Sequence, residues 1–158
     1  MTQDSPTAED RLKALGLVLP PARSPGGTST PVRRDGDLLY VSGQRPHRPD
    51  GTRYTDKVGT NVTVAEAYPH ARLTGLEILA ALKAETGSLE NIRFLKIFGM
   101  VNAAPEFCDH PQVINGCSDL LGEVLEERGR HARSAIGMGS LPGNMTVEIE
   151  AVVRVISA

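Results

Sequence analysis

Residues 111–127 read PQVINGCSDLLGEVLEE and carry the clearest helical pattern in the chain. Apolar side chains recur there in steps of one and three residues, which lines them up along one face of a helix. They are Val113, Ile114, Cys117, Leu120, Leu121, Val124 and Leu125. Because such a face must be buried against another element, the pattern predicts a helix that covers a second layer.

The segment 147–156, VEIEAVVRVI, supplies the matching layer. Side chains of a strand alternate between two faces, and here one face is wholly apolar: Val147, Ile149, Ala151, Val153 and Val155. The other face mixes Glu148, Glu150 and Arg154 with Val152 and Ile156. A half-apolar second face is typical of an oligomer interface, although a solvated face with scattered apolar residues has the same pattern.

The remaining segments extend this layered α+β arrangement. The expected elements are a hairpin of strands 32–34 and 38–41 with Asp35-Gly36 in a type I′ turn, a helix that begins at the capping box Thr63–Glu66 and ends at Gly87, a strand 92–102 and a strand 133–138. The order is therefore ββαβαββ, with two helices packed on one sheet. Residues 30–158 are predicted to form this single domain.

Residues 1–29 are expected to precede the domain as a helical arm and a tether. Thr7 caps a short helix in residues 1–16, in which Leu12 and Leu15 form an apolar stripe. Proline and glycine interrupt residues 17–29, which predicts an irregular segment there.

Composition excludes several classes of function. The chain has 158 residues, of which 40% are hydrophobic, a composition that suits one globular domain. Its net charge of −2 and its 4% aromatic residues argue against nucleic-acid binding. No apolar run is long enough to span a membrane, and the acidic start MTQDSPTAED does not resemble a secretion signal, so a cytoplasmic location is expected. Cys108 and Cys117 are then expected to be free thiols, with Cys117 buried.

Two groups of charged residues are candidates for chemistry. Glu148 and Glu150 share a strand face and could divide acid and base roles, or they could simply be solvated or paired with Arg154. Arg133 opens a strand after Arg128, Arg130 and His131, and a buried arginine requires an anion, either an internal carboxylate such as Glu148 or a ligand. The four histidines lack metal-ligand spacing, and no dinucleotide or phosphate-binding loop is present, so no metal or cofactor is expected.

Four blocks, in this order and spacing, resemble the Rid (YjgF/YER057c/UK114) family, formerly called endoribonuclease L-PSP. They are Leu39-Tyr40-Val41-Ser42-Gly43-Gln44, Ala132-Arg133-Ser134-Ala135-Ile136, Leu141-Pro142 and Val147-Glu148-Ile149-Glu150-Ala151. The resemblance covers residues 30–156 and is closest to a longer-chain branch with His-Ala-Arg-Ser and Val-Ile-Asn-Gly. It implies a chorismate-mutase-like fold and a homotrimer whose sheets form an inner barrel.

The resemblance also implies a site in each cleft between subunits. Family members hydrolyse reactive enamines and imines, such as 2-aminoacrylate, to 2-oxo acids and ammonia without a cofactor. By resemblance, Arg133 binds the substrate carboxylate and Glu148 holds the attacking water. Ser42 and Gly43 line the pocket, and Asn115 lies near it on the second helix.

This sequence departs from the family pattern in two places near that site. Residues 28–32 read TSTPV where deaminating members commonly have a tyrosine, and His131 stands where a proline is usual. A trimer that binds small carboxylates without turnover is therefore the alternative function. A ribonuclease is disfavoured by the net charge of −2 and the six phenylalanine and tyrosine residues.

Overall fold

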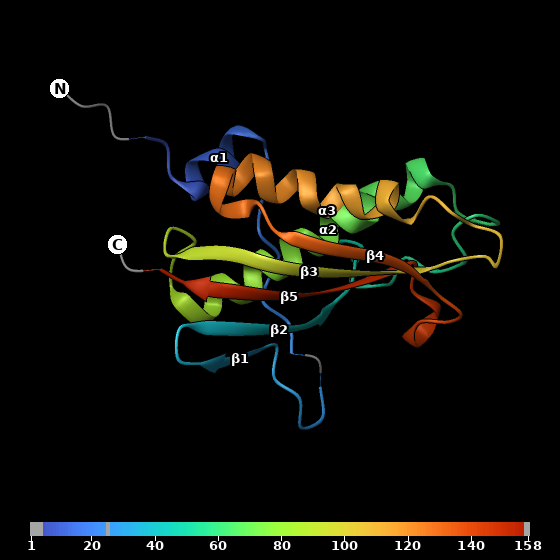
Figure 1. Cartoon of the computed structure of the whole chain (residues 1–158), viewed down its shortest axis with the longest axis horizontal. Helices are drawn as coiled ribbons and strands as arrows, with labels where there is room; N and C mark the ends of the chain where they lie inside the picture. The colour runs from blue at the N-terminus through green and yellow to red at the C-terminus, as the bar shows by residue number, and fades with distance from the viewer. Residues whose placement is uncertain (1–4, 25, 157–158) are drawn as a thin grey trace.

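The computed structural model of the chain describes residues 5–24 and 26–156 (Figure 1). Its elements are helix α1 (Ala8–Ala14), strands β1 (Val32–Asp35) and β2 (Leu38–Gln44), helix α2 (Val64–Thr86), strand β3 (Ile92–Asn102), helix α3 (His110–Leu125), and strands β4 (Ala132–Met138) and β5 (Val147–Val155). The order of elements after α1 confirms the predicted ββαβαββ pattern.

One five-stranded sheet joins all the strands in the order β1-β2-β5-β3-β4. Neighbouring strands run antiparallel except β3 and β4, which are parallel. Parallel neighbours need a crossover connection, and α3 provides it by running back over the sheet between them. The last strand of the chain, β5, therefore lies in the middle of the sheet.

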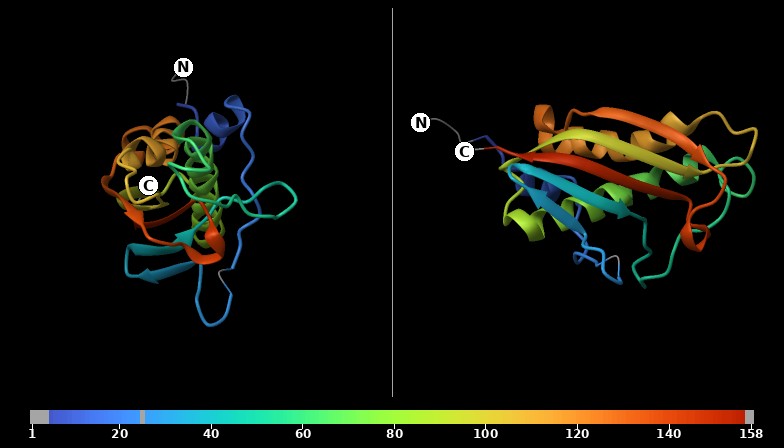
Figure 2. Two further views of the ribbon diagram at one scale, coloured as in Figure 1. Left: turned by 90° about the vertical axis from the view of Figure 1, so that its right-hand side faces the viewer. Right: turned by 60° about the horizontal axis from the view of Figure 1, so that its bottom comes forward.

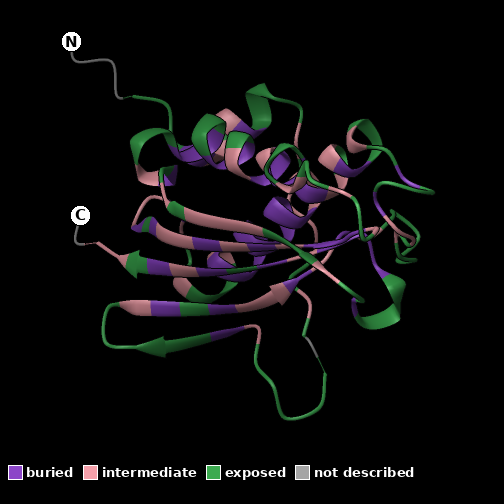
Figure 3. Cartoon of the chain, turned by 45° about the vertical axis from the view of Figure 1, so that its right-hand side comes forward, coloured by how far each residue is buried: buried purple, intermediate pink, exposed green. Residues whose placement is uncertain are grey.

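Both long helices cover the same face of the sheet and leave its other face open (Figure 2). The apolar side of β5 faces the helices, since Val147, Ile149 and Val153 have no exposed surface. Burial alternates along the central strands in the same way (Figure 3). The open face includes Tyr40 and Ile136, which are 46% and 40% exposed.

Local capping explains where α2 and the helical arm begin. Thr63 and Glu66 form the predicted capping box at α2, and Thr7 and Asp10 form one at α1. At its other end, α2 stops at Gly87, which takes the left-handed conformation with φ 77°. The predicted start and end residues of this helix are thus confirmed.

Helices α2 and α3 approach each other closely at Gly116. A Cβ atom at this position would lie 2.0 Å from the backbone oxygen of Tyr68, so only glycine allows the contact. The apolar residues of α3 named from the sequence are all buried in this interface and against the sheet. Helix α3 ends at Leu125 and a 3₁₀ turn, Glu126–Gly129, continues it.

The helical arm packs onto α3. Arg11 Nε donates a hydrogen bond to the backbone oxygen of Val124 over 2.7 Å, and Leu12 is 4% exposed. The predicted apolar stripe is confirmed for Leu12 but wrong for Leu15, which lies at the end of α1 and is 43% exposed. From there, Leu17 and Leu19 of the tether pack against the main core.

The β1–β2 turn differs from the sequence expectation. Asp35 pairs with Leu38, so the two loop residues are Gly36 and Asp37 rather than Asp35 and Gly36. Only Gly36 has a positive φ, 61°, whereas a type I′ turn needs two. The type I′ assignment is wrong because the strands pair one residue further along than the Asp-Gly signal suggested.

Two further expectations concern the thiols and the membrane. Both cysteines are free, with Cys108 exposed and Cys117 buried, as predicted. Among the described residues, no helix has the length and apolar character needed to cross a bilayer.

Candidate functional site

Arg133 lies at the start of the edge strand β4 and points toward α3. Its Nη1 donates hydrogen bonds to Asn115 Oδ1 over 2.8 Å and to Ser118 Oγ over 3.1 Å. These two residues are one helical turn apart, so both reach the same guanidinium. The Nε and Nη2 edge makes no hydrogen bond to any residue that the structure describes. This edge has the fork geometry that binds a carboxylate through two parallel hydrogen bonds.

His131 continues the hydrogen-bond chain behind Arg133. Its Nδ1 lies 2.6 Å from the backbone oxygen of Gly129, which can only accept, so Nδ1 carries the proton. Burial lowers the pKa of His131, the Gly129 carbonyl opposes this effect, and the positive charge of Arg133 adds to it. The neutral ring therefore accepts from Ser118 Oγ through Nε2 over 2.9 Å. Ser118 Oγ in turn accepts a hydrogen bond from Arg133 Nη1, which fixes the guanidinium in place.

Glu148 occupies a second cluster on β5. Burial raises the pKa of this carboxyl, the positive charge of Arg45 opposes the rise, and Glu150 adds to it. Its side chain lies directly over Gly43, where a Cβ atom would be only 2.1 Å from Glu148 Oε1. No residue in the described part of the chain forms a hydrogen bond or ion pair with the Glu148 carboxylate. A half-buried carboxylate with a raised pKa and free oxygens is suited to accept a proton from water.

Ser42 belongs to the same stretch as Gly43 but its hydroxyl is already engaged. Ser42 Oγ donates to the backbone oxygen of Thr30 over 2.7 Å. Ser42 and Gly43 together form a bulge in β2, since Val41 pairs with Ala151 and Gln44 with Ile149. The bulge brings the backbone of Gly43 against Glu148.

The two clusters are on opposite faces of the sheet. Arg133 lies beside Ile97, on the face covered by the helices, whereas Glu148 lies beside Met100 on the open face. Strand β3 also separates β4 from β5. Glu148 is therefore not the anion that accompanies Arg133 within one chain. Arg154 does not pair with either glutamate, because its Nε lies 3.1 Å from Asp37 Oδ2.

One hollow lies beside Arg133 and another beside Gly43. A cavity of about 390 Å³ is lined by Arg133, Ser118 and His131, among others. A smaller one of about 180 Å³ is lined by Gly43, Gln44 and Arg45. The first could admit a small acid to the Arg133 fork.

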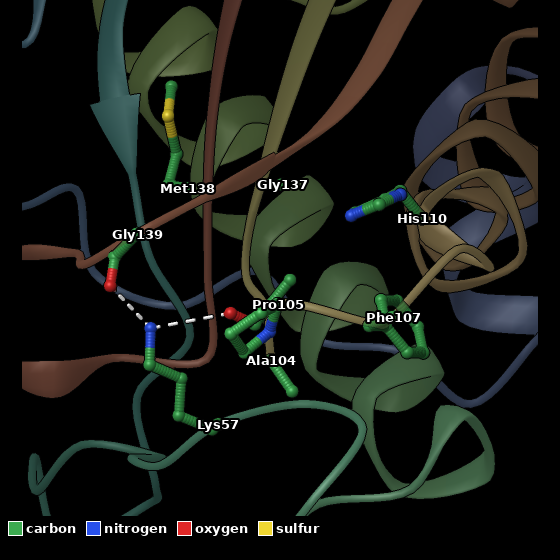
Figure 4. Close-up of a pocket in the computed structure, with 9 residues that line it drawn as sticks. Lys57, Ala104, Pro105, Phe107, His110, Gly137, Met138 and Gly139 are labelled. Atoms are coloured by element: carbon green, nitrogen blue, oxygen red, sulfur yellow. Dashed lines mark hydrogen bonds between the residues drawn. The ribbon is translucent and has the colours of Figure 1, made fainter.

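A third cavity, of about 560 Å³, lies beyond the ends of β3 and β4 and contains none of the predicted site residues (Figure 4). Lys57 Nζ crosses it and donates to the backbone oxygens of Ala103 and Gly139. The ring of His110 meets that of Phe107 edge-on, with the centroids 5.0 Å apart. Because Lys57 donates hydrogen bonds to two carbonyls, it links the two loops that carry them.

Sequence reasoning missed two contributors to these clusters. Ser118 could have been found, because it follows Asn115 by one helical turn on the side of α3 that faces β4. Arg45 directly follows the predicted pocket-lining block, but only the bulge in β2 brings its charge to Glu148. In the described part of the chain, no three histidine, cysteine, aspartate or glutamate side chains gather as metal ligands would.

Comparisons with known proteins agree with this fold. Residues 9–152 match the family model described as "YjgF/chorismate_mutase-like, putative endoribonuclease". Protein TCP17 of Trypanosoma cruzi is 37% identical over 145 residues, which cover 90% of this chain and 91% of that protein.

Two solved structures extend the comparison. Atu1372 of Agrobacterium tumefaciens, a protein of unknown function, is 45% identical with a TM-score of 0.87, over 94% of each chain. A "putative endoribonuclease" of Shewanella oneidensis MR-1 is 33% identical with a TM-score of 0.90, over 94% of this chain and 99% of that one. With sequence motifs, family model and structural relatives in agreement, this chain belongs to the YjgF/chorismate-mutase-like family, also called the Rid family.

Proposed function

We propose that the protein hydrolyses reactive enamines and imines of small 2-amino acids to 2-oxo acids and ammonia, without a cofactor. The observation that carries the proposal is Glu148, a half-buried carboxyl with a raised pKa and no hydrogen-bond partner in the described structure. Such a group suits a general base that takes a proton from water, whereas ligand binding alone does not call for it.

Arg133 supports the proposal because the Nε and Nη2 edge of its guanidinium has no partner among the described residues. A 2-imino acid has a carboxylate next to its electrophilic carbon, and the Nε and Nη2 donors would hold that carboxylate in one orientation. Asn115 and Ser118 keep the guanidinium in place from behind. Binding through two parallel hydrogen bonds fixes where the C=N carbon lies relative to the base.

The chemistry then needs only water and Glu148. The carboxylate takes a proton as the water oxygen bonds to the imine carbon, which gives a tetrahedral carbinolamine. The substrate reacts as its protonated iminium, so the carbinolamine is neutral. Protonated Glu148 returns the proton to the nitrogen, the C–N bond breaks as the C=O bond forms, and the hydroxyl proton passes to the departing ammonia, which leaves as ammonium. One water is consumed for each imine, and the carboxylate is regenerated.

Such a site must be completed by a second copy of the chain. Adjacent strands are about 4.8 Å apart, and Arg133 and Glu148 are two strands apart on opposite faces, too far for one small acid to contact both. We place Arg133, Asn115 and Ser118 of one copy against Glu148, Ser42 and Gly43 of the next. The open sheet face, with exposed Tyr40 and Ile136, is the surface through which a homotrimer would assemble.

A trimer that binds small carboxylates without turnover is the second candidate. It is favoured by residues 28–32, which lack the tyrosine of deaminating relatives, and by the Thr30 carbonyl that occupies the hydroxyl of Ser42. A binder of this kind needs Arg133 but not Glu148, so the two functions differ in their response to substitution.

The decisive experiment is ammonia release from freshly generated imines. An amino-acid oxidase supplies 2-imino acids, and semicarbazide traps whatever imine remains at each time point. The proposal expects the protein to deplete the trapped imine faster than buffer does, with 2-oxo acid and ammonia formed in equal amounts. If imine decay matches the buffer rate while 2-oxo acids still bind, the protein is the non-catalytic binder. Degradation of single-stranded RNA instead would support the ribonuclease.

A further inference from the structure

A cavity on the helix side of the molecule is separate from both clusters of the proposed active site. It has a volume of about 520 Å³ and lies between the N-terminal tether, the loop after β2 and helix α2. Leu73 and Leu76 of α2 line one wall, and Leu19 and Pro20 of the tether line another. Its size and apolar lining are those of small-molecule sites in proteins.

One acidic side chain, Glu77 of α2, lines this cavity and is almost completely buried. The side chain is 5% exposed. Its two oxygens differ in their surroundings. Oε1 accepts a hydrogen bond from His47 Nδ1 over 3.0 Å and lies 3.4 Å from Arg23 Nε, a charge contact without hydrogen-bond geometry. Oε2 is buried and has no hydrogen-bond partner in the described residues.

A buried carboxylate oxygen without a donor is unfavourable, because it has lost water and gained nothing in return. One neighbour that could supply a donor, Arg48, is engaged elsewhere. Arg48 stacks 4.4 Å above the ring centroid of Tyr54, and its Nη1 donates to the backbone oxygen of Arg53. No described side chain supplies Oε2 with a donor, so a donor carried by an occupant of the cavity would satisfy it.

We propose that this cavity binds a small organic ammonium ion with an apolar or aromatic body. An ammonium group carries three donors and forms a charge-assisted hydrogen bond to a carboxylate, which is stronger than a bond from a neutral hydroxyl. The leucine and proline walls take the apolar body. Arg23 stays on Oε1, so the carboxylate is flanked by two cations, one from the protein and one from the ligand.

This site gives the N-terminal segment a function. Arg23 and His47 line both this cavity and the small cavity beside Gly43. An occupant bound to Glu77 would therefore lie beside two residues that also border the hollow at Gly43. The ligand would thus contact the outer side of the segment that carries the proposed active-site loop.

The test uses 2-phenylethylammonium and 3-phenylpropionate, which share a phenyl body but carry opposite charges. Isothermal titration calorimetry on the full chain should show saturable binding of the ammonium, and at least tenfold weaker binding of the carboxylate. Glu77→Gln keeps the side-chain shape, removes the charge, and should lower ammonium affinity at least tenfold. The matched control is Glu85→Gln, an exposed glutamate on the same helix, which should bind like the wild type.

Glu77→Gln could also release Arg23 and loosen the tether, so a second variant leaves that cluster intact. Leu73→Trp fills the cavity from the helix side and should abolish ammonium binding with the melting temperature near the wild-type value. No binding at millimolar ammonium, tighter binding of the carboxylate, or unchanged affinity in both variants would each overturn the proposal. Because these experiments measure binding alone, their outcome does not depend on whether the protein hydrolyses imines.

Discussion

Arg133 and Glu148 pair with the same strand on opposite faces: Arg133 is beside Ile97 of β3, and Glu148 is beside Met100, an odd number of residues further along. Side chains on a strand alternate, so this spacing directs one toward the helices and the other toward the open face. A site that uses both residues has to be built from two chains. Each residue can therefore be tested for a different role in a different assay.

Replacing Arg133 should remove the binding of small 2-oxo acids. Arg133→Ala deletes a charge-assisted contact of about 1.5–3 kcal/mol, which corresponds to a loss of roughly tenfold to more than a hundredfold in affinity. Calorimetry with pyruvate measures it. Arg34→Ala is the control, because that exposed arginine lies on β1, at the opposite edge of the sheet from β4. Equal affinity in Arg133→Ala and wild type would show that Arg133 is structural.

Replacing Glu148 should stop turnover but preserve binding. Glu148→Gln keeps the shape of the side chain and removes the base, so imine hydrolysis should fall by about 10²–10⁴-fold with pyruvate affinity nearly unchanged. Glu150→Gln, an exposed neighbour on the same face, should retain most of the activity. A fully active Glu148→Gln would assign the proton transfer to another group.

The raised pKa of Glu148 also predicts an effect on stability. A carboxyl whose pKa is higher in the folded state binds its proton more tightly there, so its contribution to stability is lost as pH rises through that pKa. Glu148→Gln should therefore melt at a higher temperature than the wild type at pH 7, with a smaller difference at pH 4. A lower melting temperature at pH 7 would mean that the carboxylate is stabilised by contacts in the assembly.

Acid should destabilise the fold through His70. Burial lowers the pKa of His70 to about 4, the charge of Arg48 acts in the same direction, and Glu66 opposes it. The unfolded chain then takes up this proton from about pH 6.5 downward, and the folded chain only near pH 4, so stability is lost across that interval. Urea titrations of wild type and His70→Gln should diverge between pH 7 and pH 4, with the variant less sensitive. Parallel curves would show that His70 does not drive the loss.

Assembly should depend on the open face of the sheet. Light scattering of the wild type is expected to give three chains, and Ile136→Lys should dissociate them by placing a charge on that face. Leu15→Lys changes an equally exposed residue on the arm and should leave the assembly intact. A wild-type monomer at micromolar concentration would remove both the trimer and the shared site.

The two cysteines should react at very different rates with a thiol reagent. Cys108 is exposed, whereas burial raises the pKa of the Cys117 thiol to about 12. Only the thiolate is nucleophilic, so native protein should show one fast thiol, and the second only after unfolding. Two fast thiols would contradict the packing of α3.

Most helices and strands could be predicted from the sequence because their signals are regular or local. The stripe on α3 and the alternation on β5 are long and regular, and capping at Thr63 and Gly87 depends on residues close in sequence. The hairpin turn was harder, since a shift of one residue in pairing changes the turn type. Leu15 was misjudged because so short a helix carries little periodicity.

The site was only partly predictable because its geometry depends on contacts distant in sequence. That Arg133 and Glu148 lie on different faces follows from pairings of β3 with both β4 and β5, which the sequence of either strand does not reveal. Glu77 looked like any polar position on α2. It is buried because the tether, more than fifty residues earlier in the chain, runs across that side of the helix.

The central place of β5 has a consequence for synthesis of the protein. Both β2 and β3 take β5 as their partner, and the pairing of Leu38 with Arg154 joins the two ends of the domain. Until β5 leaves the ribosome, the β1–β2 hairpin has no strand to dock on and β3 has an unpaired edge. A nascent chain stalled before residue 147 would expose both edges, which is the kind of intermediate that chaperones bind and that aggregates when they are scarce.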